Sequence, residues 1–112
     1  MMIMSKSLSS YILFGLLAAS FVYDAAAQTS VTGRIVQTDV AAGQNYGFRV
    51  YIGSVGAHCT GGPNWAFVNE NDSNYKTFVT TLLLAKVSGS NVSIWSTNVG
   101  GYCQIYYIAT SN

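Results

Sequence analysis

Residues 71–89 read NDSNYKTFVTTLLLAKVSG, and this stretch decides the fold class of the chain. No glycine or proline interrupts residues 75–87, and side chains that can cap a helix N-terminus precede them at 71–74. Gly89 is placed to end the helix. The stretch therefore predicts one helix over 75–87, with its apolar face spaced as a helix requires. That face comprises Tyr75, Phe78, Val79, Leu82 and Leu83.

Five β segments surround this helix, three before it and two after it. The segment 46–53 alternates and puts Phe48, Val50 and Ile52 on one face, as expected of a half-buried strand. In the last segment, Cys103, Ile105 and Tyr107 are expected to share a face. The five segments are 30–38, 46–53, 65–68, 92–96 and 102–110.

The element order is therefore β-β-β-α-β-β, which is the order of a five-stranded OB-type barrel with a helix that plugs or flanks it. An open α+β sheet with the helix on one face is the alternative. Closure is favoured because only 8% of the residues are charged, so an open sheet would have little to protect its edges. We expect a mainly β domain with one helix.

The first residues are typical of a signal peptide. Lys6 precedes an apolar run at 11–19, and Ala25-Ala26-Ala27 gives the small-residue pattern of a cleavage site. An uncleaved membrane anchor is the alternative, but the run is shorter than the roughly 20 residues that a span needs. We expect a signal peptide at 1–27, a single OB-like domain at 28–112, and a secreted or periplasmic location.

Cys59 and Cys103 are the only cysteines. Exported compartments are oxidising, so a Cys59–Cys103 disulfide is expected. Two free buried thiols or half of a metal site are the alternatives. Since His58 is the only histidine, a four-ligand zinc site would need carboxylates from elsewhere in the chain. The sequence predicts a disulfide and no metal site.

Charge and hydrophobicity bear on the partners of the domain. The formal net charge is +1, which gives no basic face for a nucleic acid. Leu84 and Val87 widen the apolar arc of the helix beyond what one small core needs. We therefore expect a homo-oligomer that does not bind nucleic acid.

The residues offer little for catalysis. His58 is the only imidazole available as a general base, and it stands beside a cysteine that the disulfide is expected to use. The acids of the mature part are Asp39, Glu70 and Asp72, and the last two flank the helix N-terminus, where negative charge serves the helix. We expect no enzymatic activity and no cofactor. A hydrolase that uses His58 is the remaining enzymatic alternative.

Aromatic residues favour a binding role. The predicted strands carry many tyrosines and two tryptophans, several on the face opposite the core. Rings with polar edges suit both sugar recognition and protein interfaces. Trp65 and Tyr75 are expected to pack within the domain, whereas Tyr51, Trp95 and Tyr106 are candidate ligand-binding residues.

Two segments resemble the B subunits of AB5 toxins, in particular the subtilase-cytotoxin and pertussis-like B subunits. They are Thr32-Gly33-Arg34-Ile35-Val36 with Gly43-Gln44, and the stretch from Trp65 through the helix to Val92-Ser93-Ile94. The resemblance implies an OB-fold that forms pentamers, binds glycans and accompanies an enzymatic A subunit. It also implies that Thr32 contacts the sugar. The family usually has serine there, and it carries aromatics near the helix C-terminus where this chain has Leu84 and Lys86.

The sequence thus leads to two expectations of different class. The first is a secreted, non-catalytic subunit that recognises cell-surface glycans as a homo-oligomeric ring, with Thr32, Tyr51, Trp95 and Tyr106 at the ligand. The second is an exported structural or protein-interaction domain without a glycan ligand.

Overall fold

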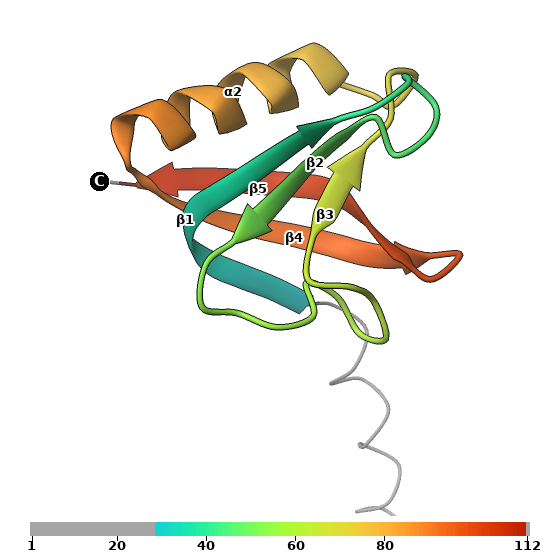
Figure 1. Cartoon of the computed structure of the whole chain (residues 1–112), viewed down its shortest axis with the longest axis horizontal. Coiled ribbons are helices and arrows are strands. Elements are labelled where there is room, and N and C mark those ends of the chain that lie inside the picture. Colours follow the sequence, from blue (N-terminus) through green and yellow to red (C-terminus); the bar gives the residue numbers. More distant parts are fainter. Residues whose placement is uncertain (1–28, 112) are drawn as a thin grey trace, which may run out of the picture.

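The computed structural model of the chain describes residues 29–111, and the predicted signal peptide at 1–27 lies outside this range. The described part contains five strands and one helix in the order β-β-β-α-β-β (Figure 1). The prediction of a mainly β domain with one helix between the third and fourth strands is confirmed. The elements are β1 (Thr29–Val40), β2 (Phe48–Ile52), β3 (Ala66–Val68), α2 (Tyr75–Ser88), β4 (Asn91–Val99) and β5 (Tyr102–Ser111).

The five strands belong to one sheet in which the last strand of the order pairs with the first. The order is β1-β2-β3-β5-β4, and β4 pairs with β1 again, so the sheet closes on itself. All neighbours are antiparallel except β3 and β5, which run parallel over a short contact. The long strand β1 serves both sides: its first half pairs with β4 and its second half pairs with β2. Closure leaves one enclosed space for the apolar side chains.

The inward faces of the strands fill this space as their alternation predicts. Phe48, Val50 and Ile52 are all buried, and the residues between them are half-exposed. Gly33 of β1 faces inward where no side chain fits, because a Cβ there would lie 2.8 Å from the Cγ2 of Ile52. Because successive side chains of a strand point to opposite faces, the neighbouring Thr32 points to the outside, where it is exposed. The core therefore determines the orientation of a predicted site residue.

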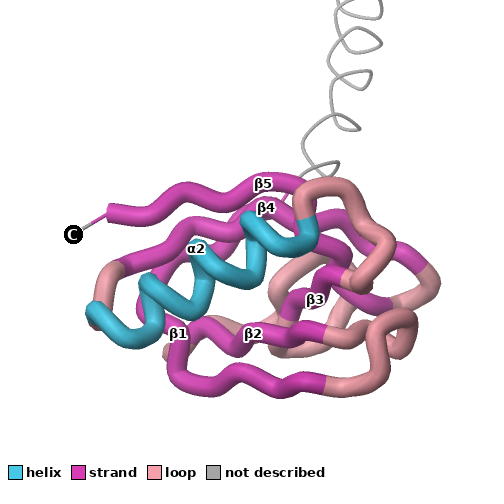
Figure 2. Tube along the Cα trace, turned by 90° about the horizontal axis from the view of Figure 1, so that it is seen from above, coloured by secondary structure: helices cyan, strands magenta, loops and turns pink. Residues whose placement is uncertain are grey.

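Helix α2 covers the closed sheet, lying across it when the molecule is seen from above (Figure 2). Leu82 and Ala85 are buried against the core. The predicted helix end is confirmed: Gly89 has a φ of 71°, its N–H donates to the carbonyl of Lys86, and the Ser90 N–H donates to that of Ala85. This left-handed closing turn satisfies two carbonyls of the last helical turn.

The helix start differs from the prediction. Asn74 precedes the helix with a φ of 60° and makes no side-chain capping hydrogen bond, and no acidic residue lies in the first turn. The Asp72 carboxylate instead accepts hydrogen bonds from the Asn69 backbone N–H at 2.8 Å and from the Gln104 side chain at 3.0 Å. Asp72 therefore joins the β3–α2 loop to β5, and the expectation that Asp72 serves the helix end is wrong.

The helix also exposes more of its apolar side than predicted. Leu83 was expected on the buried face but is 41% exposed, and the exposed fractions of Leu84 and Val87 are 65% and 86%. The buried positions are three residues apart, and this narrow stripe is all that a small closed sheet can cover. Three apolar side chains of α2 thus remain open to solvent.

A β-bulge in β5 changes the side on which one tyrosine lies. Trp95 pairs with Tyr107 while Ser96 pairs with Ile105, so Tyr106 is an extra residue that has no partner on β4. Cys103 and Ile105 point inward as predicted, but Tyr107 is 55% exposed. The expectation that Tyr107 shares their face is wrong, because the extra residue reverses the alternation.

Candidate functional site

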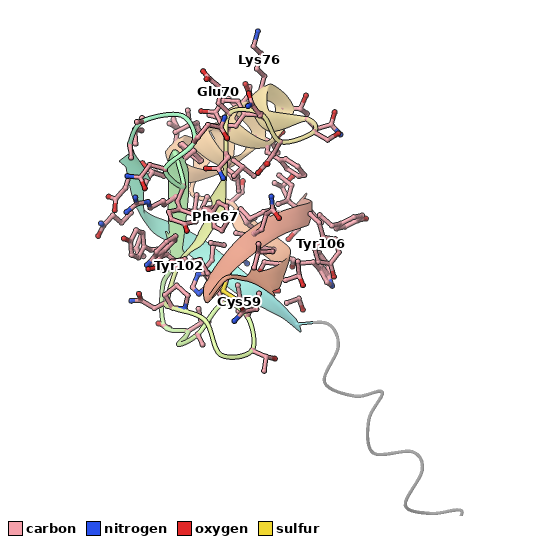
Figure 3. All side chains as sticks on the ribbon, turned by 90° about the vertical axis from the view of Figure 1, so that its right-hand side faces the viewer. Cys59, Phe67, Glu70, Lys76, Tyr102 and Tyr106 are labelled. Carbon is pink, nitrogen blue, oxygen red and sulfur yellow. A yellow bond between two sulfur atoms is a disulfide. The ribbon has the colours of Figure 1, made fainter. Side chains whose placement is uncertain are left out.

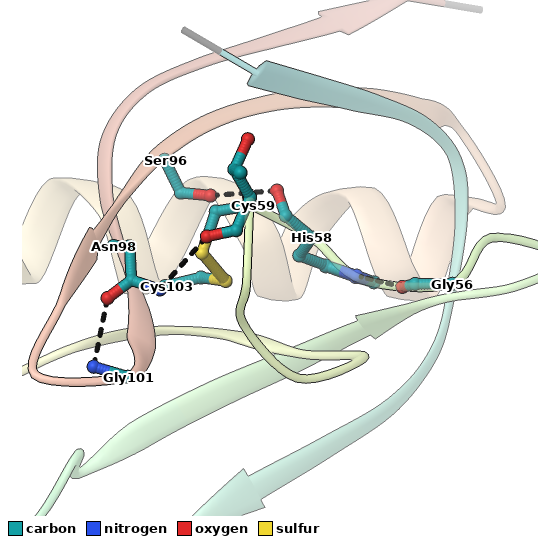
Figure 4. The surroundings of a disulfide bond; sticks show 8 residues. Gly56, His58, Cys59, Ser96, Asn98, Gly101 and Cys103 are labelled. Atoms are coloured by element: carbon teal, nitrogen blue, oxygen red, sulfur yellow. Dashed lines mark hydrogen bonds between the residues drawn. A yellow bond between two sulfur atoms is a disulfide. The ribbon is translucent and has the colours of Figure 1, made fainter. Parts of the chain in front are cut away.

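The predicted disulfide is present and anchors one end of the domain. Cys59 of the β2–β3 loop bonds to Cys103 of β5, with the two Cα atoms 5.6 Å apart (Figure 4). Both cysteines are buried. Gly62 packs directly on the bond, since a Cβ at this position would lie 2.3 Å from one sulfur and 2.5 Å from the other. The bond therefore holds the loop against β5 with no room between them.

His58, the candidate general base, is fully buried beside this bond. Its Nε2 accepts a hydrogen bond from the Ile52 backbone N–H at 3.1 Å. Its Nδ1 lies 3.0 Å from the Gly56 carbonyl, to which it donates in the neutral tautomer that this pair of contacts requires. Burial lowers the pKa of His58, although the hydrogen bond to Gly56 opposes that shift. His58 is thus a neutral structural residue that connects the loop to β2.

The state of His58 predicts a pH dependence of stability. Its pKa is lower in the folded than in the unfolded protein, so the unfolded state takes up the proton first as the pH falls. The stabilising contribution is complete above about pH 6.5, the ordinary value, and is lost as the pH falls below it. Urea unfolding between pH 7.5 and 5.5 should show a decreasing free energy of unfolding.

His58→Gln is the control for this prediction, because it should remove the slope in that window while lowering stability throughout. Asp39 also has a lowered pKa, caused first by its hydrogen bond from Gln37 and then by that from Tyr51. Its contribution is lost only below the ordinary carboxyl value, outside the window. Equal stability of the wild-type protein at pH 7.5 and pH 5.5 would contradict the lowered pKa of His58 in the folded protein.

Two hydroxyl groups meet on the outer face of β1 and β4. Thr32 pairs with Ser93, and their side-chain oxygens are 2.7 Å apart in an exposed hydrogen bond. Each hydroxyl keeps further capacity to donate or accept a hydrogen bond. Thr32 was a predicted site residue, whereas Ser93 was not. Only the pairing register brings it to Thr32, and no local motif signals that register.

An aromatic pair continues this face onto β5. Trp95 lies two residues after Ser93 on β4 and pairs with Tyr107. The two rings meet edge to face, with centroids 4.9 Å apart and an interplanar angle of 89°. Trp95 is half-buried, and Tyr107 is largely exposed. Thr32, Ser93, Trp95 and Tyr107 together make up what we call the outer face.

The two other predicted site residues are not part of the outer face. Tyr51 of β2 is half-buried, and its hydroxyl donates to the Asp39 carboxylate at 2.8 Å. Partial burial raises the pKa of Tyr51, and the hydrogen bond to Asp39 adds to the shift. Tyr106 lines a cavity of about 300 Å³ beside the start of α2, together with Asp72 and Gln104. The structure therefore brings together Thr32 and Trp95 and places Tyr51 elsewhere, on β2. Tyr106 borders the outer face, because it shares the wall of a second cavity with Tyr107.

A further aromatic cluster covers the outside of β2 and β3. Phe67 is 2% exposed although it lies outside the main core cluster, because the rings of Tyr46 and Trp65 pack against it and Tyr102 contacts both of these rings. Trp65 stacks on Tyr102 at 5.2 Å, and the Arg49 guanidinium lies 5.0 Å above the indole. Figure 3 shows Tyr102 and Tyr106 on opposite sides of the domain. Trp65 thus packs within the domain, as expected, and forms a small second core.

Comparisons with protein-family models, with curated proteins and with solved structures give no match to this chain. Within residues 29–111, no helix is long and apolar enough to cross a membrane. The same residues contain no group of three or more histidine, cysteine or acidic side chains that could hold a metal ion. A function for this chain is therefore inferred from the geometry of the outer face.

Proposed function

We propose that the chain is a secreted or periplasmic, non-catalytic subunit that recognises glycans through its outer face and works as a homo-oligomer. The observation that carries the proposal is the juxtaposition of an exposed tyrosine and a half-buried tryptophan with two hydroxyls on three neighbouring strands. A ring face can stack on the C–H-rich side of a sugar while the hydroxyls bond to its polar groups. A small face of this composition suits a saccharide.

The fold and the chemistry of the remaining residues support the proposal. The order β1-β2-β3-β5-β4, with the helix between β3 and β4, fits an OB-type barrel, a fold that presents binding residues on its strands. The disulfide fits an oxidising compartment. His58 is buried with both ring nitrogens bonded, which leaves no exposed imidazole for acid–base chemistry.

Two adjacent tyrosines provide a matched test. Tyr107→Ala removes the ring that contacts Trp95 on the outer face, whereas Tyr106→Ala removes a neighbouring ring of similar exposure for which the described residues show no contact with Trp95. The first substitution should weaken glycan binding about tenfold or more, as expected for a central aromatic contact. The second should leave the affinity within about twofold. The measurement is a titration of the oxidised protein with the glycans that bind best on an array.

Two results would contradict the proposal. In the first, the oxidised oligomer binds no glycan on the array. In the second, the two variants lose glycan affinity to the same extent.

The second candidate is an exported protein-interaction domain, and the exposed Leu83, Leu84 and Val87 of α2 favour it. A stoichiometric complex with one exported protein, lost in Leu84→Lys but not in Tyr107→Ala, would support this candidate over glycan binding.

A further inference from the structure

The second edge of β5 is largely unpaired. Along one edge, β5 pairs with β4 from the Val99–Tyr102 pair to the Asn91–Ser111 pair. Along the other edge, β3 meets it only at Cys103 and Gln104. Among the residues that the structure describes, no strand lies on this side of residues 105–111. Every second backbone N–H and C=O there points away from the sheet, ready to pair with another strand.

This edge lacks the charged residues and prolines that usually prevent such pairing. The strand reads YCQIYYIATS and contains no charged residue and no proline. The bulge at Tyr106 lies at the start of the open edge and leaves residues 107–111 beyond it as a regular strand. Proteins that keep an edge monomeric place a lysine, a proline or a bulge along it, or cover it with a helix or loop. The last half of β5 carries no lysine, proline or bulge, and cavities remain between it and α2.

There is room beside the edge for the side chains of an added strand. Two cavities of about 340 Å³ and 230 Å³ lie between α2 and β5 and share Thr81 in their walls. In Figure 1, β5 is drawn between α2 and β4, with its open side toward the helix. The walls contain no charged side chain and consist of hydroxyl, apolar and aromatic groups with the amide of Asn74, among them Thr77, Leu84, Tyr107 and Thr110. The side chains of an uncharged strand paired to this edge would meet no charged group there.

We propose that the open edge of β5 pairs antiparallel with the same edge of a second copy of the chain, about a two-fold axis. Such an axis sets the strand against itself, so any charge near its centre would meet its own like charge. The absence of charge from β5 and from the cavity walls satisfies this requirement. One contact then covers both open edges, and the assembly closes with two subunits.

This inference rests on the homo-oligomeric part of the proposed function and deepens it. It does not depend on the identity of the ligand, although Tyr107 belongs both to the outer face and to the wall of one cavity. The test is the mass of the oxidised protein in solution, measured by native mass spectrometry and by light scattering at several concentrations. A dimer is expected. Thr110→Lys places one charge on each side of the axis, so the dissociation constant should rise about tenfold or more. Val99→Lys adds the same charge at an exposed site of β4 outside the open edge and should leave the dimer intact.

Backbone hydrogen exchange of the wild-type protein provides a second test if Thr110→Lys folds poorly. In the wild-type protein, outward-pointing amides within 105–111 should exchange slowly at high concentration and faster on dilution. A monomer at all concentrations, a mass of five subunits, or a dimer whose 105–111 amides exchange freely would overturn the inference. Loss of glycan binding in Tyr107→Ala with the dimer unchanged would leave it standing, and a dimer that binds no glycan would overturn only the proposed ligand.

Discussion

Replacing Cys59 and Cys103 together by alanine is expected to lower the free energy of unfolding by about 4 kcal/mol. The two cysteines are 44 residues apart, and closing a loop of this length removes about that much conformational freedom from the unfolded chain. The described domain of residues 29–111 is small enough that its core alone supplies only a few kcal/mol. The double variant should therefore be partly unfolded at 37 °C.

Urea unfolding of the oxidised protein and of the double variant measures this difference. Reduction of the wild-type protein serves as the control, because it should lower the stability by a similar amount without any change of sequence. A loss below about 1 kcal/mol in both cases would show that the packing of the loop on β5, and not the covalent bond, stabilises this end of the sheet.

Leu82→Ala is expected to cost about 3 kcal/mol, whereas Leu84→Ala should cost less than about 0.5 kcal/mol. Leu82 is fully buried on the side of α2 that faces the sheet, and truncating it leaves a cavity between the helix and the closed sheet. Leu84 carries the same side chain two residues further along the helix but is 65% exposed. The pair isolates burial from helix propensity, because the two substitutions are identical and lie in the middle of the same helix.

Thermal or urea unfolding of the two variants checks this expectation. If Leu84→Ala destabilises as strongly as Leu82→Ala in the dimeric protein but not in a Thr110→Lys background, then Leu84 lies in a subunit interface. Similar losses in both backgrounds would contradict the helix orientation.

Local patterns were enough to predict most of the fold. The alternation of Phe48, Val50 and Ile52 gave the inward face of β2, and Gly89 gave the end of α2, because each depends only on neighbouring residues. The disulfide followed from the compartment and from the presence of two cysteines. The closure of the sheet could be argued only indirectly, since it depends on which strand edges meet.

The outer face could be predicted only in part. Thr32 and Trp95 were singled out, and the pairing of β1 with β4 brings them to one side of the sheet. Ser93 and Tyr107 were missed for related reasons. The position of Ser93 beside Thr32 depends on the strand register, and Tyr107 is turned outward by the bulge at Tyr106. An extra residue in one strand leaves no trace in simple alternation.

Asp72 shows a different limit of sequence reasoning. An acidic residue just before a helix is most often a cap, but this carboxylate bonds to the Asn69 backbone and to Gln104 of β5. Gln104 is 32 residues away in the sequence, and the folded sheet brings it within hydrogen-bond distance. Only such a long-range partner shows that Asp72 connects the loop to β5 and does not cap the helix.

The two tryptophans of the chain offer the most direct test of the proposed glycan site. Trp95 lies on the outer face against Tyr107, and Trp65 lies in the second aromatic cluster against Tyr102. Their indole N–H signals in a ¹H–¹⁵N NMR spectrum should respond differently when the oxidised protein is titrated with the glycans selected on an array. The proposed site predicts that the Trp95 signal shifts and saturates while the Trp65 signal stays in place. A shift of Trp65 alone, or no shift of either signal with any glycan, would contradict it.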